Sequence, residues 1–80
     1  MTMATTMRKI LLDAAAEATW KTEPRDAGQH IEVQYAGIVI EEGAYELRRT
    51  RDLSVAGSPW SIEAREQGRR GWRSVGDLPA

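Results

Sequence analysis

The sequence predicts an α+β fold in which one N-terminal helix packs on an antiparallel meander sheet of four or five strands. Apolar residues repeat at helical spacing in residues 6–21 and at every second position from about residue 30 onward. The connections between the later segments are short, whereas parallel strands need crossovers of about a dozen residues or more. Because the chain has 80 residues, we expect one domain over residues 1–80.

The helix is predicted over residues 6–21, a stretch without glycine or proline. Its main apolar stripe has the i, i+3, i+4, i+7 spacing of a buried helix face and consists of Met7, Ile10, Leu11, Ala14 and Ala18. A second apolar row consists of Leu12, Ala16 and Trp20. This row either is wrapped by the sheet or is exposed and meets a partner.

Alternation and short apolar runs predict strands at residues 30–35, 38–41, 44–50, 59–66 and 70–75. Ala36-Gly37 is expected to form a turn or a bulge between the first two strands. A polar residue followed by glycine predicts a tight turn at Glu42-Gly43 and another at Gln67-Gly68. The helix is expected to cover one face of the sheet, and the other face is expected to be wet or to meet a partner.

Two tryptophans are expected in the core. Strand alternation places Trp60 on the same face as Ile62, and Trp72 is expected to share that core from the adjacent strand. Large aromatic side chains are effective core fillers in a chain that contains no phenylalanine.

Residue types and spacings that carry catalysis are missing from the sequence. It has no cysteine, a single histidine (His30), no glycine-rich phosphate loop and no nucleophile elbow. Glu41 and Glu42 are adjacent, so on a strand they point to opposite faces and do not form a catalytic carboxylate pair. We therefore expect a protein that is not an enzyme and has no cofactor, no metal and no catalytic residues.

Charge is divided unevenly along the chain, although the net charge is only −1. Residues 1–46 hold eight acidic and four basic side chains, whereas residues 47–80 hold four acidic side chains and seven arginines. Acidic side chains from the predicted helix and first hairpin are expected to face a basic groove on a protein partner. This acidic set is Asp13, Glu17, Glu32, Glu41, Glu42 and Glu46. The alternative is that these acids only pair with the arginines, at little net gain.

The C-terminal part favours a second function, a small nucleic-acid-binding or regulatory module. Arginines hold phosphates and aromatic rings stack on unpaired bases. The residues of this arginine set are Arg65, Arg69, Arg70, Trp72 and Arg73. Because nucleic-acid-binding domains are usually strongly basic, the net charge of −1 makes a protein partner the preferred hypothesis.

A small, cysteine-free domain with one helix, a meander sheet and no active site resembles the phage-encoded anti-CRISPR proteins that act on type I effector complexes. The resemblance is one of size and kind and covers the whole chain. It implies a non-enzymatic inhibitor that binds the Cascade complex and blocks target-DNA binding, with the acidic set as the contact. Since no secretory signal is evident and no apolar run is long enough to span a membrane, we expect the protein in the cytoplasm, that of the host cell if the gene is phage-encoded. We also expect a monomer.

Overall fold

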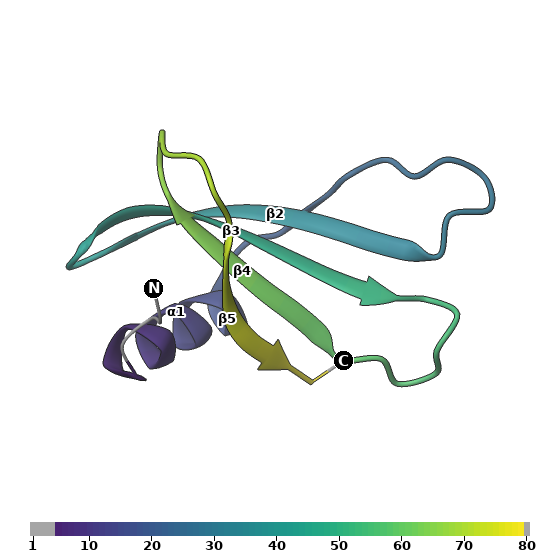
Figure 1. Ribbon diagram of the computed structural model, residues 1–80, viewed down its shortest axis with the longest axis horizontal. Coiled ribbons are helices and arrows are strands. Elements are labelled where there is room, and N and C mark those ends of the chain that lie inside the picture. Colours follow the sequence, from purple (N-terminus) through teal and green to yellow (C-terminus); the bar gives the residue numbers. More distant parts are fainter. Residues whose placement is uncertain (1–4, 80) are drawn as a thin grey trace.

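One helix and a five-stranded sheet make up the computed structural model, which describes residues 5–79. The elements are α1 (Thr5–Glu17), β1 (Lys21–Thr22), β2 (Ile31–Ile40), β3 (Gly43–Asp52), β4 (Trp60–Glu66) and β5 (Arg73–Leu78). All neighbouring strands are antiparallel, and their order in the sheet is their order in the chain (Figure 1). The predicted α+β fold, with an N-terminal helix and a meander sheet, is confirmed.

The helix is shorter than predicted and ends at Glu17 instead of residue 21. Trp20 leaves the helical path, and its indole N–H donates to the carbonyl of Ala15 at 3.0 Å. The backbone N–H of Ala18 donates to the same carbonyl at 3.4 Å, so both bonds satisfy a carbonyl group at the end of the helix. Lys21 and Thr22 then join the sheet as β1, opposite Tyr35 and Gln34.

Strand β2 runs without a break where a turn or bulge at Ala36-Gly37 was expected. The pairing with β3 is continuous from Ile31, opposite Asp52, to Ile40, opposite Gly43. The last strand begins at Arg73 instead of residue 70. Gly68 and Gly71 both have positive φ, at 83° and 89°, so the chain makes a wide connection before β5 begins.

The core lies between α1 and the β4–β5 side of the sheet. Its buried residues are Leu11, Ala15, Leu47, Trp60, Ile62, Ala64 and Val75. The helix contacts β5 and β4, and Figure 1 shows it beside β5, away from the first residues of β2. Leu12 and Trp20 of the second apolar row are half-buried against this core, whereas Ala16 is exposed.

Strand pairing divides the sheet residues between two faces. Leu47 lies opposite Ala36 and Ala64, and these three buried residues mark the face that carries the core. Residues one position along each strand point the other way. This second face, called the open face below, carries Tyr35 and Val39 of β2, Glu46 and Arg48 of β3, and Glu63 and Arg65 of β4.

The two tryptophans predicted for the core have different positions. Trp60 is in the core with 6% of its surface exposed, as predicted. The placement of Trp72 in that core is wrong, because its ring lies over Arg48 and Arg65 on the open face. Trp72 precedes β5, on the connection that the two positive-φ glycines widen, and therefore does not follow the alternation of a regular strand.

Candidate interaction surface

Trp72 organises a cluster on the open face. The guanidinium carbons of Arg48 and Arg65 lie 4.5 Å and 4.3 Å from the centroid of the Trp72 ring. The Tyr35 ring centroid is 6.2 Å from the Trp72 centroid, with the two planes tilted by 49°. We call Tyr35, Arg48, Arg65 and Trp72 the Trp72 cluster; it joins β2, β3 and β4 to the β4–β5 connection.

Glutamates hold both arginines of the Trp72 cluster in place. Arg48 donates from Nε and Nη2 to Glu63 Oε1 at 3.0 Å and 2.8 Å. Arg65 donates in the same way to Glu46 Oε2 at 3.1 Å and 2.8 Å. Both pairs join directly opposite residues on neighbouring strands. The arginines are thus fixed at both the ring and the carboxylate, and their charges are locally balanced.

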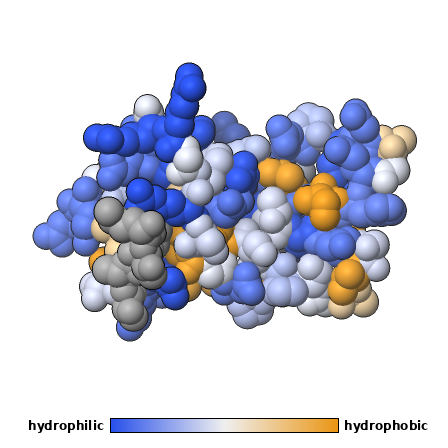
Figure 2. Space-filling model, in the orientation of Figure 1, coloured by the Kyte–Doolittle hydropathy of each residue, from blue (hydrophilic) through white to orange (hydrophobic). Residues whose placement is uncertain are grey.

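Exposed apolar side chains accompany the Trp72 cluster along β2. Tyr35 and Ile31 lie on the open face with 37% and 47% of their surfaces exposed. At the start of β2 the backbone N–H of Leu53 donates to the carbonyl of His30, and Leu53 and Val55 are 41% and 55% exposed. Figure 2 shows hydrophobic surface at this right-hand end of the molecule. The open face therefore combines aromatic, arginine and apolar side chains, and the exposed Leu53 and Val55 lie in the β3–β4 loop at one end of the sheet.

A second group of arginines covers core tryptophans on the face of the sheet that carries the core. Arg49 lies 4.4 Å from the Trp20 centroid and 4.2 Å from the Trp60 centroid, and Arg51 lies 4.3 Å from Trp60. Burial lowers the pKa of Arg49, the charge of Arg51 lowers it further, and Glu32 acts in the opposite direction. These residues cover the tryptophan rings where α1 has ended.

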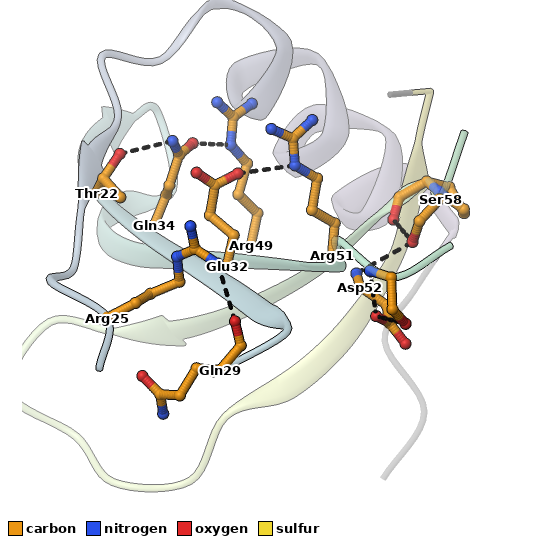
Figure 3. A network of polar contacts seen from close by, with 11 residues as sticks. Thr22, Arg25, Gln29, Glu32, Gln34, Arg49, Arg51, Asp52 and Ser58 are labelled. Atoms are coloured by element: carbon orange, nitrogen blue, oxygen red, sulfur yellow. Dashed lines mark hydrogen bonds and ion pairs between the residues drawn. The ribbon is translucent and has the colours of Figure 1, made fainter. Parts of the chain in front are cut away.

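Polar bonds fix these arginines in position (Figure 3). Arg49 Nε donates to Gln34 Oε1 at 2.6 Å, and Gln34 Nε2 donates to Thr22 Oγ1 at 2.9 Å. Arg51 Nε donates to Glu32 Oε1 at 2.7 Å. The network ties β1, β2 and β3 together and has a structural role.

The acidic set predicted to contact a partner is not assembled into one surface. Asp13 and Glu17 are exposed on α1, and Glu41 and Glu42 are exposed in the β2–β3 turn. Glu32 and Glu46 are on opposite faces of the sheet and are paired with Arg51 and Arg65. The structure therefore leaves separate acidic groups on α1 and on the turn.

The alternative arginine set is only partly brought together. Arg65 and Trp72 are in contact, and Arg69 is exposed with an ion pair to Glu66 at 3.2 Å. Arg70 and Arg73 are exposed on the β4–β5 connection and at the start of β5.

Sequence reasoning missed Tyr35 and Arg48 as members of the cluster. Strand register contained the signal that would have found them. A two-residue turn at Glu41-Glu42 puts Tyr35 opposite Arg48, and alternation then puts both on the face of Glu46.

In residues 5–79, no three acidic or histidine side chains converge as a metal site requires. Within this described region no helix combines the length and the apolar character that a membrane crossing needs. No protein-family model, no curated protein and no solved structure matches the chain.

Proposed function

We propose that this chain is a non-catalytic binding module that engages a protein partner through the open face of its sheet. The observation that carries the proposal is the Trp72 cluster, in which partly exposed aromatic and arginine side chains are packed together on the face opposite the core. Tyrosine, tryptophan and arginine are the residue types most enriched at the energetic centres of protein interfaces.

Preorganisation makes this surface suited to binding. A partner that contacts a mobile arginine must immobilise it, at roughly 0.5–1.5 kcal/mol for each such side chain. Arg48 and Arg65 are already held by Glu63, Glu46 and the Trp72 ring. Binding at the cluster therefore needs less ordering than binding at free surface arginines.

Local charge favours protein over nucleic acid at the Trp72 cluster. Each arginine of the cluster has its own glutamate at 2.8 Å. Nucleic-acid surfaces draw most of their affinity from arginine and lysine charges that neutralise phosphates. A cluster with balanced charges and adjacent apolar side chains matches a protein surface better.

The specific form of the proposal is an inhibitor of a type I CRISPR effector complex, acting in the cytoplasm of the host cell. It is supported by the resemblance in size and kind to anti-CRISPR proteins. Purified type I Cascade and its target DNA test it in a mobility-shift assay. Reduced target binding in the presence of the chain supports this form, and unchanged binding eliminates it.

Two matched variants separate the open face from the acidic groups in a quantitative affinity purification from the native cells. Tyr35→Ser removes an exposed ring of the Trp72 cluster, and the double variant Asp13→Asn/Glu17→Gln neutralises the exposed acids of α1. We expect Tyr35→Ser to lose the partner that the wild-type chain retains, and the helix variant to keep it. Loss with the helix variant alone would transfer the binding surface to α1.

The alternative function is nucleic-acid binding by the arginine set. The observation that favours it is the exposure of Arg69, Arg70 and Arg73 beside Trp72. Titration of a Trp20→Phe/Trp60→Phe variant, in which Trp72 is the remaining tryptophan, with a single-stranded oligonucleotide at low salt tests it through tryptophan fluorescence. Quenching that weakens as salt rises supports the alternative. We expect no quenching, because guanidinium groups already lie against the Trp72 ring.

A further inference from the structure

The outer edge of β2 is only partly paired among the residues that the structure describes. Strand β1 has two residues and pairs with Gln34 and Tyr35, whereas β3 pairs with β2 over its whole length. The described chain therefore leaves the second half of β2, from Gly37 to Ile40, with a neighbour on one side.

The alternating direction of backbone hydrogen bonds along β2 shows which N–H and C=O groups face outward from this edge. The N–H of Leu53 donates to the carbonyl of His30 on the β3 side, and the N–H of Glu23 donates to the carbonyl of Val33 on the β1 side. In an antiparallel ladder these directions alternate along the strand. The N–H and C=O groups of Gly37 and Val39 consequently point away from β3, as those of Val33 do.

Gly37 has no structural reason within the described fold to be glycine. The other six glycines have positive φ, whereas Gly37 does not. A Cβ added at Gly37 would meet nothing within 4 Å. A shallow hollow of about 260 Å³ lies at this position, and it is lined, besides Gly37, by Thr19, Lys21, Tyr35, Ala36, Glu46 and Leu47. Glycine inside a strand weakens it and often marks a close approach by another backbone.

Val39 is an exposed apolar side chain on the same edge as this hollow. It lies two residues from Gly37 on the same face, and 84% of its surface is exposed. Natural edge strands are usually protected by charge, proline or a bulge. The segment Gly37-Ile38-Val39-Ile40 has none of these features.

We propose that this edge pairs with the same edge of a second copy of the chain, antiparallel and about a two-fold axis that passes between the two Ile38 residues. Gly37 then lies opposite Val39 of the second copy, and the reverse pair forms symmetrically. Four backbone hydrogen bonds join these two pairs, because all the groups involved point outward. Val39 of each copy lies beside Gly37 of the other on the open face, where Gly37 has no side chain to obstruct it, and the two Ile38 side chains meet on the opposite face.

The length of the free edge and the charges at its ends favour a second copy of the chain over an unrelated strand. Position 40 of the second copy falls opposite Ala36, and the next position along the edge is occupied by Lys21, which pairs with Tyr35. Strand β2 ends at Ile40, so the added strand fills the free edge and then turns away. Glu41, the first turn residue, comes next to Lys21 of the other copy, so opposite charges meet at both ends of the interface.

The dimer departs from the monomer expected from the sequence, and it does not depend on the proposed function. Stable protein interfaces bury about 1,200–2,000 Å² in total. An edge of four residues provides less than this, so we expect a weak, concentration-dependent dimer. Both open faces remain on the same side of the extended sheet and stay accessible.

Sedimentation velocity across a range from about 1 μM to about 1 mM tests the proposal, since weak associations have dissociation constants in this range. We expect the wild-type chain to shift from monomer to dimer. Val39→Lys places a charge in the apolar pairing and is expected to weaken the dimer about tenfold or more, because a symmetric interface counts each change twice. Val39→Pro removes an outward N–H without removing a bond to β3 and should weaken the dimer similarly.

Ile31→Lys is the matched control, since Ile31 is an exposed apolar residue of the same strand and face but lies outside the pairing. We expect this variant to dimerise like the wild type. Circular dichroism of each variant establishes that it is folded. A wild-type chain that stays monomeric over the whole range overturns the proposal, even if a foreign strand binds the edge. A folded Val39→Lys variant that dimerises normally overturns it as well.

Discussion

Arg49 contacts two tryptophan rings at the end of the core that α1 leaves uncovered. Its guanidinium lies 4.4 Å from Trp20 and 4.2 Å from Trp60, and Gln34 fixes its orientation. The planar guanidinium can stack on both rings while it bonds through Nε, whereas the ammonium group of lysine cannot. The neighbouring charge of Arg51 opposes this arrangement, and Glu32 partly compensates for it.

Arg49→Lys should therefore lower the free energy of unfolding by about 1 kcal/mol, within the range of partly desolvated cation–π contacts. Urea denaturation followed by tryptophan fluorescence measures this change. Arg70→Lys at an exposed position is the matched control and should leave the midpoint unchanged. Equal effects of the two substitutions would contradict the role given to Arg49.

Asp52 gives the molecule a defined response to acid. The Ser54 hydroxyl at 2.6 Å and the Ser54 backbone N–H at 2.9 Å donate to Asp52 Oδ1. These bonds, the hydroxyl first, lower the pKa of Asp52 below its ordinary value of 3.8. The charged carboxylate is thus favoured in the folded state, so its stabilising effect is present above the unfolded pKa and is lost as pH falls through the folded pKa.

Ser54→Ala should raise the pKa of Asp52 toward 3.8 and should reduce stability above that pH but not well below it. NMR titration of the Asp52 carboxyl carbon measures the pKa directly. An unchanged pKa in the variant would show that the Ser54 hydroxyl does not set the ionisation of Asp52.

At the scale of elements, the pairing of β4 with β5 is irregular where the sheet lies against the helix. The register shifts between Ile62, opposite Gly76, and Glu63, opposite Ser74. This shift leaves Val75 without a direct partner on β4, and its side chain is buried in the core with 1% exposed. Gly76 has a φ of 150°, and a Cβ built there would lie 3.3 Å from Cδ1 of Leu12 in α1.

Gly76→Ala should destabilise the fold by about 1–3 kcal/mol, because alanine is strained at this φ and must displace Leu12. Gly37→Ala is the matched control, since Gly37 has extended backbone and free space around it. At concentrations where the chain is monomeric, this control should be neutral or stabilising by roughly 0.4–1 kcal/mol. Chemical denaturation of both variants makes the comparison. A destabilisation of similar size at Gly37 would contradict it.

Periodicity was sufficient to predict the types of most elements but not their ends. Residues 18–21 continue a helical pattern, yet the indole of Trp20 bonds back to Ala15 and ends the helix earlier. Gly37 reads as a turn residue in the sequence, but continuous pairing with β3 keeps it in an extended strand. The first difference depends on a side-chain bond that periodicity does not register, and the second depends on pairing with a separate strand.

The candidate site was predictable to about the same degree. Arg65 and Trp72 were identified from composition, whereas Tyr35 and Arg48 required the register of β2 on β3. The same register separates the acidic set. Even-numbered residues of β2 share a face with odd-numbered residues of β3, so Glu32 and Glu46 are on opposite faces. The acidic residues that are concentrated in the first half of the sequence therefore do not form a single acidic surface in the fold.

At the scale of the whole molecule, one helix covers one side of the sheet and leaves the other side with its own ordered cluster. The helix contacts β4 and β5, and the network around Arg49 covers the tryptophan rings beyond its end. The Trp72 cluster on the open face is not needed to close this core. Its ordered, partly exposed side chains are the basis of the proposed protein-binding function.

Site-specific photocrosslinking in the native cells tests this claim most directly. A photoreactive phenylalanine analogue replaces Tyr35 on the open face or Asp13 on the exposed side of α1, and adducts are identified by mass. The proposed function predicts a discrete protein adduct from position 35 and none from position 13. Adducts from position 13 alone, a nuclease-sensitive adduct, or no adduct from either position would contradict it.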